Sequence, residues 1–104
     1  MILRRGRFHE LVERQLDLFE AESDLLAEAA EADAAWTSAD AKESEELYGD
    51  YQLVVDAIGE RLHELRETYA ASLDEVTAMD YRQAFDRAAR KRFGRLAAFL
   101  EEDA

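Results

Sequence analysis

The sequence predicts an all-α protein, with three long helices in an elongated antiparallel hairpin or bundle. Proline and cysteine are absent, and only four glycines occur among 104 residues. Alanine, leucine, glutamate and arginine dominate, and no run of β-branched residues points to a strand. Apolar residues recur at helical spacing through most of the chain. The length suits one core, so we expect a single helical domain, 1–104, with helices at about 3–35, 38–71 and 75–101.

The first predicted helix, 3–35, carries apolar side chains in two neighbouring stripes, because residues seven apart share a helix face. The first stripe consists of Leu11, Leu18 and Leu25. The second consists of Phe8, Val12, Phe19 and Leu26. Two stripes indicate contact with two neighbouring helices, in a three-helix bundle or in an oligomer.

The second predicted helix, 38–71, has the clearest apolar face, centred on Tyr51, Ile58 and Leu65. The connection before it is expected near Trp36, the only tryptophan, whose ring would plug that end of the hairpin. Thr37 and Asp40 have the spacing of an N-terminal capping box. On the opposite side of the helix, Leu53 is either a lone exposed leucine or an oligomer contact.

The third predicted helix, 75–101, has an ambiguous start, because Ser72-to-Glu75 and Thr77-to-Asp80 both have capping-box spacing. Arg92 projects within its apolar face. Glu22 and Gln15 lie between the two stripes of the first helix, so we predict that Arg92 pairs with one of them. Such a pair would set the register between the helices.

Short connections make consecutive helices antiparallel, so the third helix should lie beside the first and run in the same direction. A thin rod of three helices has a narrow core. We therefore expect self-association to complete the burial of apolar surface.

The net charge of −12 limits the classes of partner. An acidic surface repels nucleic-acid phosphates and anionic lipid headgroups, so we expect neither a nucleic-acid nor a membrane partner. No apolar stretch is long enough to span a bilayer. The start, MILRRGRF, lacks the apolar run of a secretion signal, and without cysteine no disulfide can form. These features favour a cytoplasmic location.

One arrangement of residues is compatible with a metal centre. Glu60 and His63 form a Glu-x-x-His pair, and a hairpin turning near Trp36 would bring Glu13 level with Glu60. Ferritin-like helical assemblies bind iron or manganese with such a set. However, both Glu60 and His63 point away from the predicted apolar face, so the site would require an interface between two chains.

The chain resembles the small secreted WXG-type hairpins in three features: its length, its predicted helical hairpin and the position of Trp36 at the turn. The glycine of that motif is missing from Trp36-Thr37-Ser38, and so is the tyrosine-based tail signal. The correspondence is confined to those three features, and no family is assigned from it.

No nucleophile–base arrangement, phosphate-binding loop or carboxylate in an apolar run is apparent. The sequence therefore favours a non-enzymatic helical interaction or structural module whose partner is a protein, most simply a second copy of itself. It calls for no cofactor. The metal-binding assembly is the alternative.

Overall fold

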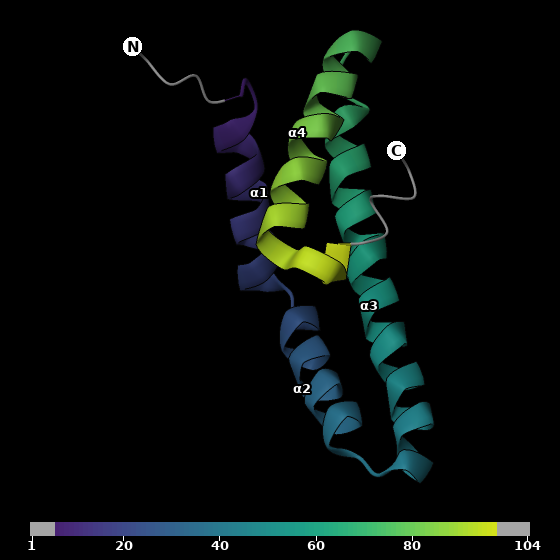
Figure 1. The fold of residues 1–104 in the computed structure, drawn as a ribbon. Coiled ribbons are helices and arrows are strands. Elements are labelled where there is room, and N and C mark those ends of the chain that lie inside the picture. The colour runs from purple at the N-terminus through teal and green to yellow at the C-terminus, as the bar shows by residue number, and fades with distance from the viewer. Residues whose placement is uncertain (1–5, 98–104) are drawn as a thin grey trace.

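The computed structural model describes residues 6–97, and all its regular elements there are helical (Figure 1). This confirms the all-α class, but there are four α-helices where three were predicted. They are α1 (His9–Glu22), α2 (Leu25–Ser38), α3 (Ala41–Ala70) and α4 (Glu75–Phe93), followed by a 3-10 helix, η1 (Gly94–Ala97).

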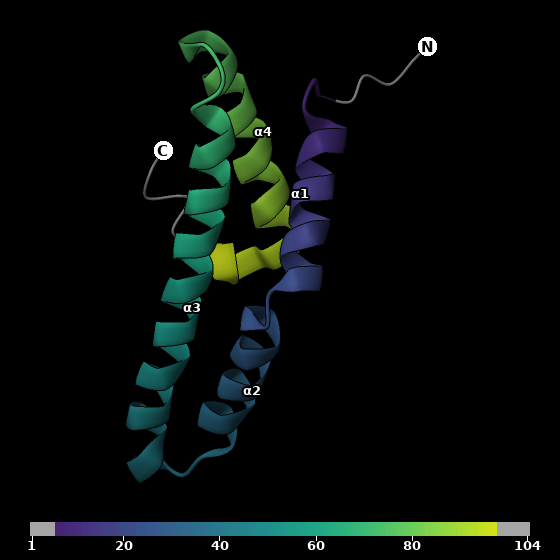
Figure 2. The same ribbon diagram turned by 180° about the vertical axis from the view of Figure 1, so that it is seen from behind.

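The 30-residue α3 runs the length of a molecule that measures 53 × 30 × 24 Å. Figures 1 and 2 show α2 lying along its N-terminal half, while α1 and α4 lie beside its C-terminal half. The rings of Phe8 and Tyr81 meet edge-on at 5.5 Å, and those of Phe19 and Phe93 at 5.7 Å. These two pairs show that α1 and α4 run in the same direction, as expected for the first and last helices.

The prediction of one helix over 3–35 is wrong, because the chain breaks at Ser23 and Asp24. Ser23 has an extended backbone (φ −106°, ψ 133°), and its hydroxyl accepts a hydrogen bond from the Leu25 N–H at 3.2 Å. Serine and aspartate side chains compete for backbone hydrogen bonds in this way and favour helix ends. The break lets α1 pack against α4 while α2 follows α3. Residues 6–8 precede the helix, and 3–5 lie outside the described range.

The predicted capping box of Thr37 and Asp40 is also wrong, because Thr37 still belongs to α2. Asp40 itself caps α3, and its side chain accepts hydrogen bonds from the backbone N–H groups of Lys42 and Glu43, both at 3.0 Å. An aspartate in this position satisfies donors that the first helical turn leaves unpaired. α3 therefore begins at Ala41, three residues later than predicted, and ends at Ala70, within one residue of the prediction.

Neither predicted capping box begins the last helix. Asp74 is the N-cap, and its carboxylate accepts from the N–H and the hydroxyl of Thr77 at 2.9 and 2.8 Å. α4 ends at Phe93, not at 101, because Gly94 takes a positive φ of 58° and its N–H donates to the Arg90 carbonyl. Glycine adopts that backbone conformation without the steric penalty of a Cβ. Residues 98–101 lie outside the described range.

The core is densest where α1, α3 and α4 meet. The largest side chains there with less than 2% exposure are Val12, Leu16, Ile58, Leu62, Tyr81 and Phe85. Tyr51 and Ile58 of the predicted α3 face are buried, and Leu65 packs against the core while remaining partly exposed. The apolar periodicity of α3 therefore predicted its inward face correctly.

Candidate functional site

The three candidate metal ligands do not come together within one chain. Glu60 and His63 are exposed on α3. Glu13 lies on α1 with its Oε2 2.6 Å from Nη2 of Arg92. Among residues 6–97, no three histidine or acidic side chains are placed to share a metal ion. The outward direction predicted for Glu60 and His63 agrees with this placement. No observation among residues 6–97 favours a metal site between two chains.

Arg92 contacts α1, but at residues other than those predicted. Its guanidinium lies 2.8 Å from Oδ1 of Asp17, in addition to the contact with Glu13, and 3.6 Å from Glu20. Its side chain is 23% exposed, so these carboxylates hold it against α1. Glu22 is exposed, one turn of the helix beyond Asp17.

Gln15, the other predicted partner of Arg92, has a different role. Its Oε1 accepts a hydrogen bond of 2.8 Å from the hydroxyl of Tyr81, which is fully buried. Burial raises the pKa of Tyr81 to about 12, because the phenolate would lose its hydration. This bond and the Arg92 contacts both join α1 to α4.

A charged network between α3 and α4 was missed from the sequence. Arg66 is only 4% exposed, and it donates to Asp86 at 2.7 Å and to Glu67 at 2.8 Å. Arg82 donates to both carboxylate oxygens of Glu67. The Arg82 hydrogen bonds lower the pKa of Glu67 to about 2, with a smaller contribution from Arg66 and against the effect of burial. The four-residue spacing of Ile58, Leu62 and Arg66 was the signal that placed this arginine on the buried face.

Trp36 lies in the last turn of α2 and faces α3. Its indole ring meets the ring of Tyr48 edge-on at 4.9 Å, and its Nε1 donates to Asp33 at 3.0 Å. The ring contact joins the two helices next to their connection, whereas the hydrogen bond to Asp33 lies within α2. Leu53 is 67% exposed on the outer face of α3.

A groove lies between α1 and α3, and α4 packs against both of these helices. It consists of two adjoining hollows of about 440 and 390 Å³ that share Gln15, Arg61 and Leu65. Leu18 and Leu25 line the second hollow, and Tyr69 lines the first. Leu18 is 51% exposed. The groove thus exposes apolar side chains from both flanking helices.

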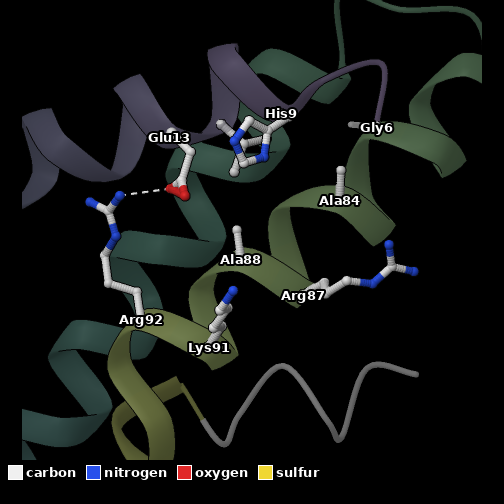
Figure 3. Close-up of a pocket in the computed structure, with 9 residues that line it drawn as sticks. Gly6, His9, Glu13, Ala84, Arg87, Ala88, Lys91 and Arg92 are labelled. Atoms are coloured by element: carbon white, nitrogen blue, oxygen red, sulfur yellow. Dashed lines mark hydrogen bonds and ion pairs between the residues drawn. The ribbon is translucent and has the colours of Figure 1, made fainter. Parts of the chain in front are cut away.

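A separate cleft of about 430 Å³ lies between α1 and α4 (Figure 3). Val12, Ala84 and Ala88 supply apolar surface, and basic side chains of α4 stand at its edge. Its full lining is Gly6, His9, Val12, Glu13, Ala84, Arg87, Ala88, Lys91 and Arg92.

Comparisons with protein-family models, with curated proteins and with solved structures give no match for this chain. Within residues 6–97, no helix combines the length and the apolar character needed to cross a bilayer. The groove, the cleft and the ion pairs are therefore the features of the molecule that bear on its function.

Proposed function

We propose that this protein is a non-enzymatic helical interaction module that self-associates through the α1–α3 groove. The observation that carries the proposal is the incomplete burial of the first leucine stripe of the sequence. Phe8, Val12 and Phe19 of the second stripe are buried, whereas Leu18 of the first is half-exposed and lines the groove together with Leu25. An apolar helical face that residues 6–97 leave open favours docking of a further helix.

A helix laid in this groove would contact both α1 and α3 and complete a four-helix arrangement. A two-fold axis close to Leu18 would place α1 of each copy in the groove of the other, which is the self-complementary contact of a symmetric dimer. α1 has 14 residues and is about 20 Å long. Because a contact of that length is short, we expect a reversible dimer whose population depends on protein concentration.

Charge also favours the groove over other surfaces. Its walls carry Arg61 and Glu64, which form an exposed ion pair, so both signs are present. By contrast, the segment from Ser38 to Glu60 holds seven acidic residues and one lysine. Two copies of that segment would repel each other. Since each copy carries −12 overall, added salt should strengthen the dimer by screening the remaining repulsion.

Sedimentation velocity over a range of protein concentrations tests the proposal. The wild-type chain should shift from monomer to dimer, and Leu18→Glu should remain monomeric with unchanged helical circular dichroism, because Leu18 is half-exposed. Leu53→Glu is the matched control, since it places the same charge at an exposed leucine outside the groove. Monomeric wild-type protein at millimolar concentration would refute self-association. Loss of the dimer in Leu53→Glu alone would refute the groove as its site.

A cytoplasmic location belongs to this proposal and rests on the sequence. No observation in the described residues favours the iron or manganese centre, so it is not proposed as a second function.

A further inference from the structure

We infer that the cleft between α1 and α4 binds a small organic anion with an apolar body, such as an aryl carboxylate or an aryl phosphate. This site is separate from the proposed dimer surface. His9, Val12 and Glu13 of α1 line the cleft, whereas Gln15 and Leu18 line the groove. At about 100° per residue the two sets lie on different sides of α1.

The shape of the cleft suits a ring or a short hydrocarbon group. Ala84 and Ala88 are four residues apart on α4, and their methyl groups point towards α1 (Figure 3). Larger side chains at these two positions would fill the space. The volume, about 430 Å³, lies within the range of small-molecule sites, which are mostly apolar with a few placed polar groups.

The charge at its edge suits an anion. Arg87 and Lys91 both line the cleft, and neither forms an ion pair with a described residue. Arg66, Arg82 and Arg92, by contrast, all contact carboxylates. Two basic side chains that remain available in an acidic protein favour a ligand that brings its own negative charge.

The one acidic side chain that lines the cleft is in an ion pair. Glu13 lines it, but Nη2 of Arg92 contacts the Glu13 carboxylate at 2.6 Å. Arg92 therefore offsets the repulsion that Glu13 would exert on an anion. The positive charges of Arg87 and Lys91 oppose a metal cation. An amphipathic anion would place its head between Arg87 and Lys91 and its apolar body over Ala84 and Ala88.

Isothermal titration calorimetry on the full chain at low salt tests this inference with three probes. They are 1-naphthyl phosphate, 1-naphthoate and inorganic phosphate. We expect saturable binding of one or both naphthyl compounds below millimolar concentration, and much weaker binding of inorganic phosphate, which has no apolar body. Leu18→Glu should bind the probes as the wild-type chain does, so failure of the proposed dimer leaves this test intact.

Two variants locate the binding. Lys91→Gln should weaken naphthyl binding by about threefold to tenfold, because it removes one exposed charge-assisted contact. Arg14→Gln removes the same charge from an exposed position of α1 outside the cleft and should have little effect. Ala88→Leu should abolish binding by filling the cleft, and circular dichroism would show whether it folds.

Three results would overturn the inference. The first is the absence of naphthyl binding up to millimolar concentration. The second is an equal loss in Lys91→Gln and Arg14→Gln, which would assign the effect to net charge alone. The third is binding of inorganic phosphate as tightly as its naphthyl ester, which would show that the apolar surface is not used.

Discussion

Replacing Glu67 by glutamine should destabilise the protein near neutral pH and make its stability less sensitive to acid. Glu67 accepts hydrogen bonds from Arg82 at 3.2, 2.9 and 2.8 Å, and one of 2.8 Å from the buried Arg66. These bonds favour the ionised carboxylate, which explains why its pKa falls from the ordinary 4.5 to about 2. Glutamine retains an acceptor oxygen but loses the charge.

The pKa shift of Glu67 and its exposure determine how much stability the variant should lose. A carboxyl pKa lowered from 4.5 to about 2 corresponds to at most about 3 kcal/mol of stabilisation at neutral pH. The Glu67 side chain is 33% exposed, and its partner Arg82 is 39% exposed, so solvent screens part of this interaction. We therefore expect Glu67→Gln to lower the free energy of unfolding by about 1–2 kcal/mol at pH 7.

The direction with pH follows from proton uptake. As pH falls below about 4.5, the unfolded chain binds a proton at Glu67, while the folded chain keeps this carboxyl ionised until about pH 2. Protonation therefore favours the unfolded state, and the contribution of Glu67 is lost between about pH 4.5 and 2. The difference in stability between wild type and Glu67→Gln should be constant above pH 5 and shrink steadily below it.

Urea unfolding followed by circular dichroism, at pH 7, 5, 4 and 3, measures this difference directly. Glu64→Gln is the matched control on the same helix, because its carboxylate is 67% exposed and lies 3.5 Å from an equally exposed Arg61. It should change stability by less than about 0.5 kcal/mol at every pH. If the loss in Glu67→Gln stays the same from pH 7 to pH 3, or equals that of Glu64→Gln, the charged network does not contribute as described.

Two further predictions concern single residues that shape the fold. Gly94→Ala should destabilise the protein by about 1–2 kcal/mol in urea unfolding, because φ at this residue is 58° and ψ is −128°. Gly49 lies inside α3, where no described atom would meet an added Cβ within 4 Å, so Gly49→Ala should stabilise the protein by about 0.5–1 kcal/mol. A change of the same sign in both variants would contradict this reasoning. Tyr81→Phe should cost about 1 kcal/mol at pH 7 through the lost bond to Gln15. Above pH 10 the unfolded chain ionises Tyr81 first, so wild type should lose stability up to about pH 12 faster than Tyr81→Phe, as alkaline unfolding curves will test.

The division of the first predicted helix has a direct consequence for the proposed function. A single straight helix over residues 9–38 would hold α1 in line with α2, which follows α3. The break at Ser23 instead lets α1 turn towards α4, as Figure 1 shows. Its second stripe is then buried, and Leu18 is left at the open groove.

The candidate sites were predictable only in part. Arg92 lies within a mainly apolar face, so a contact with α1 was predictable, but its carboxylate partners were not. Glu22 and Asp17 are both acidic and only five residues apart, so the rotation and register of α1 against α4 select between them. The cleft lined by Arg87 and Lys91 could not be predicted from the sequence either, because its lining combines residues more than seventy positions apart.

The sequence by itself determined the all-helical class, the extent of α3 to within a few residues and the face of α3 that turns inward. These features depend on local propensity and on the 3.6-residue period, which neighbouring residues carry. Only the tertiary structure decided the break at Ser23, the partners of Arg92, and the position of the groove and the cleft. The apolar spacing continues from Leu18 to Leu25 across the break, so the local pattern alone predicts a continuous helix. The bend follows from tertiary packing, because it lets α1 pack against α4 while α2 packs against α3.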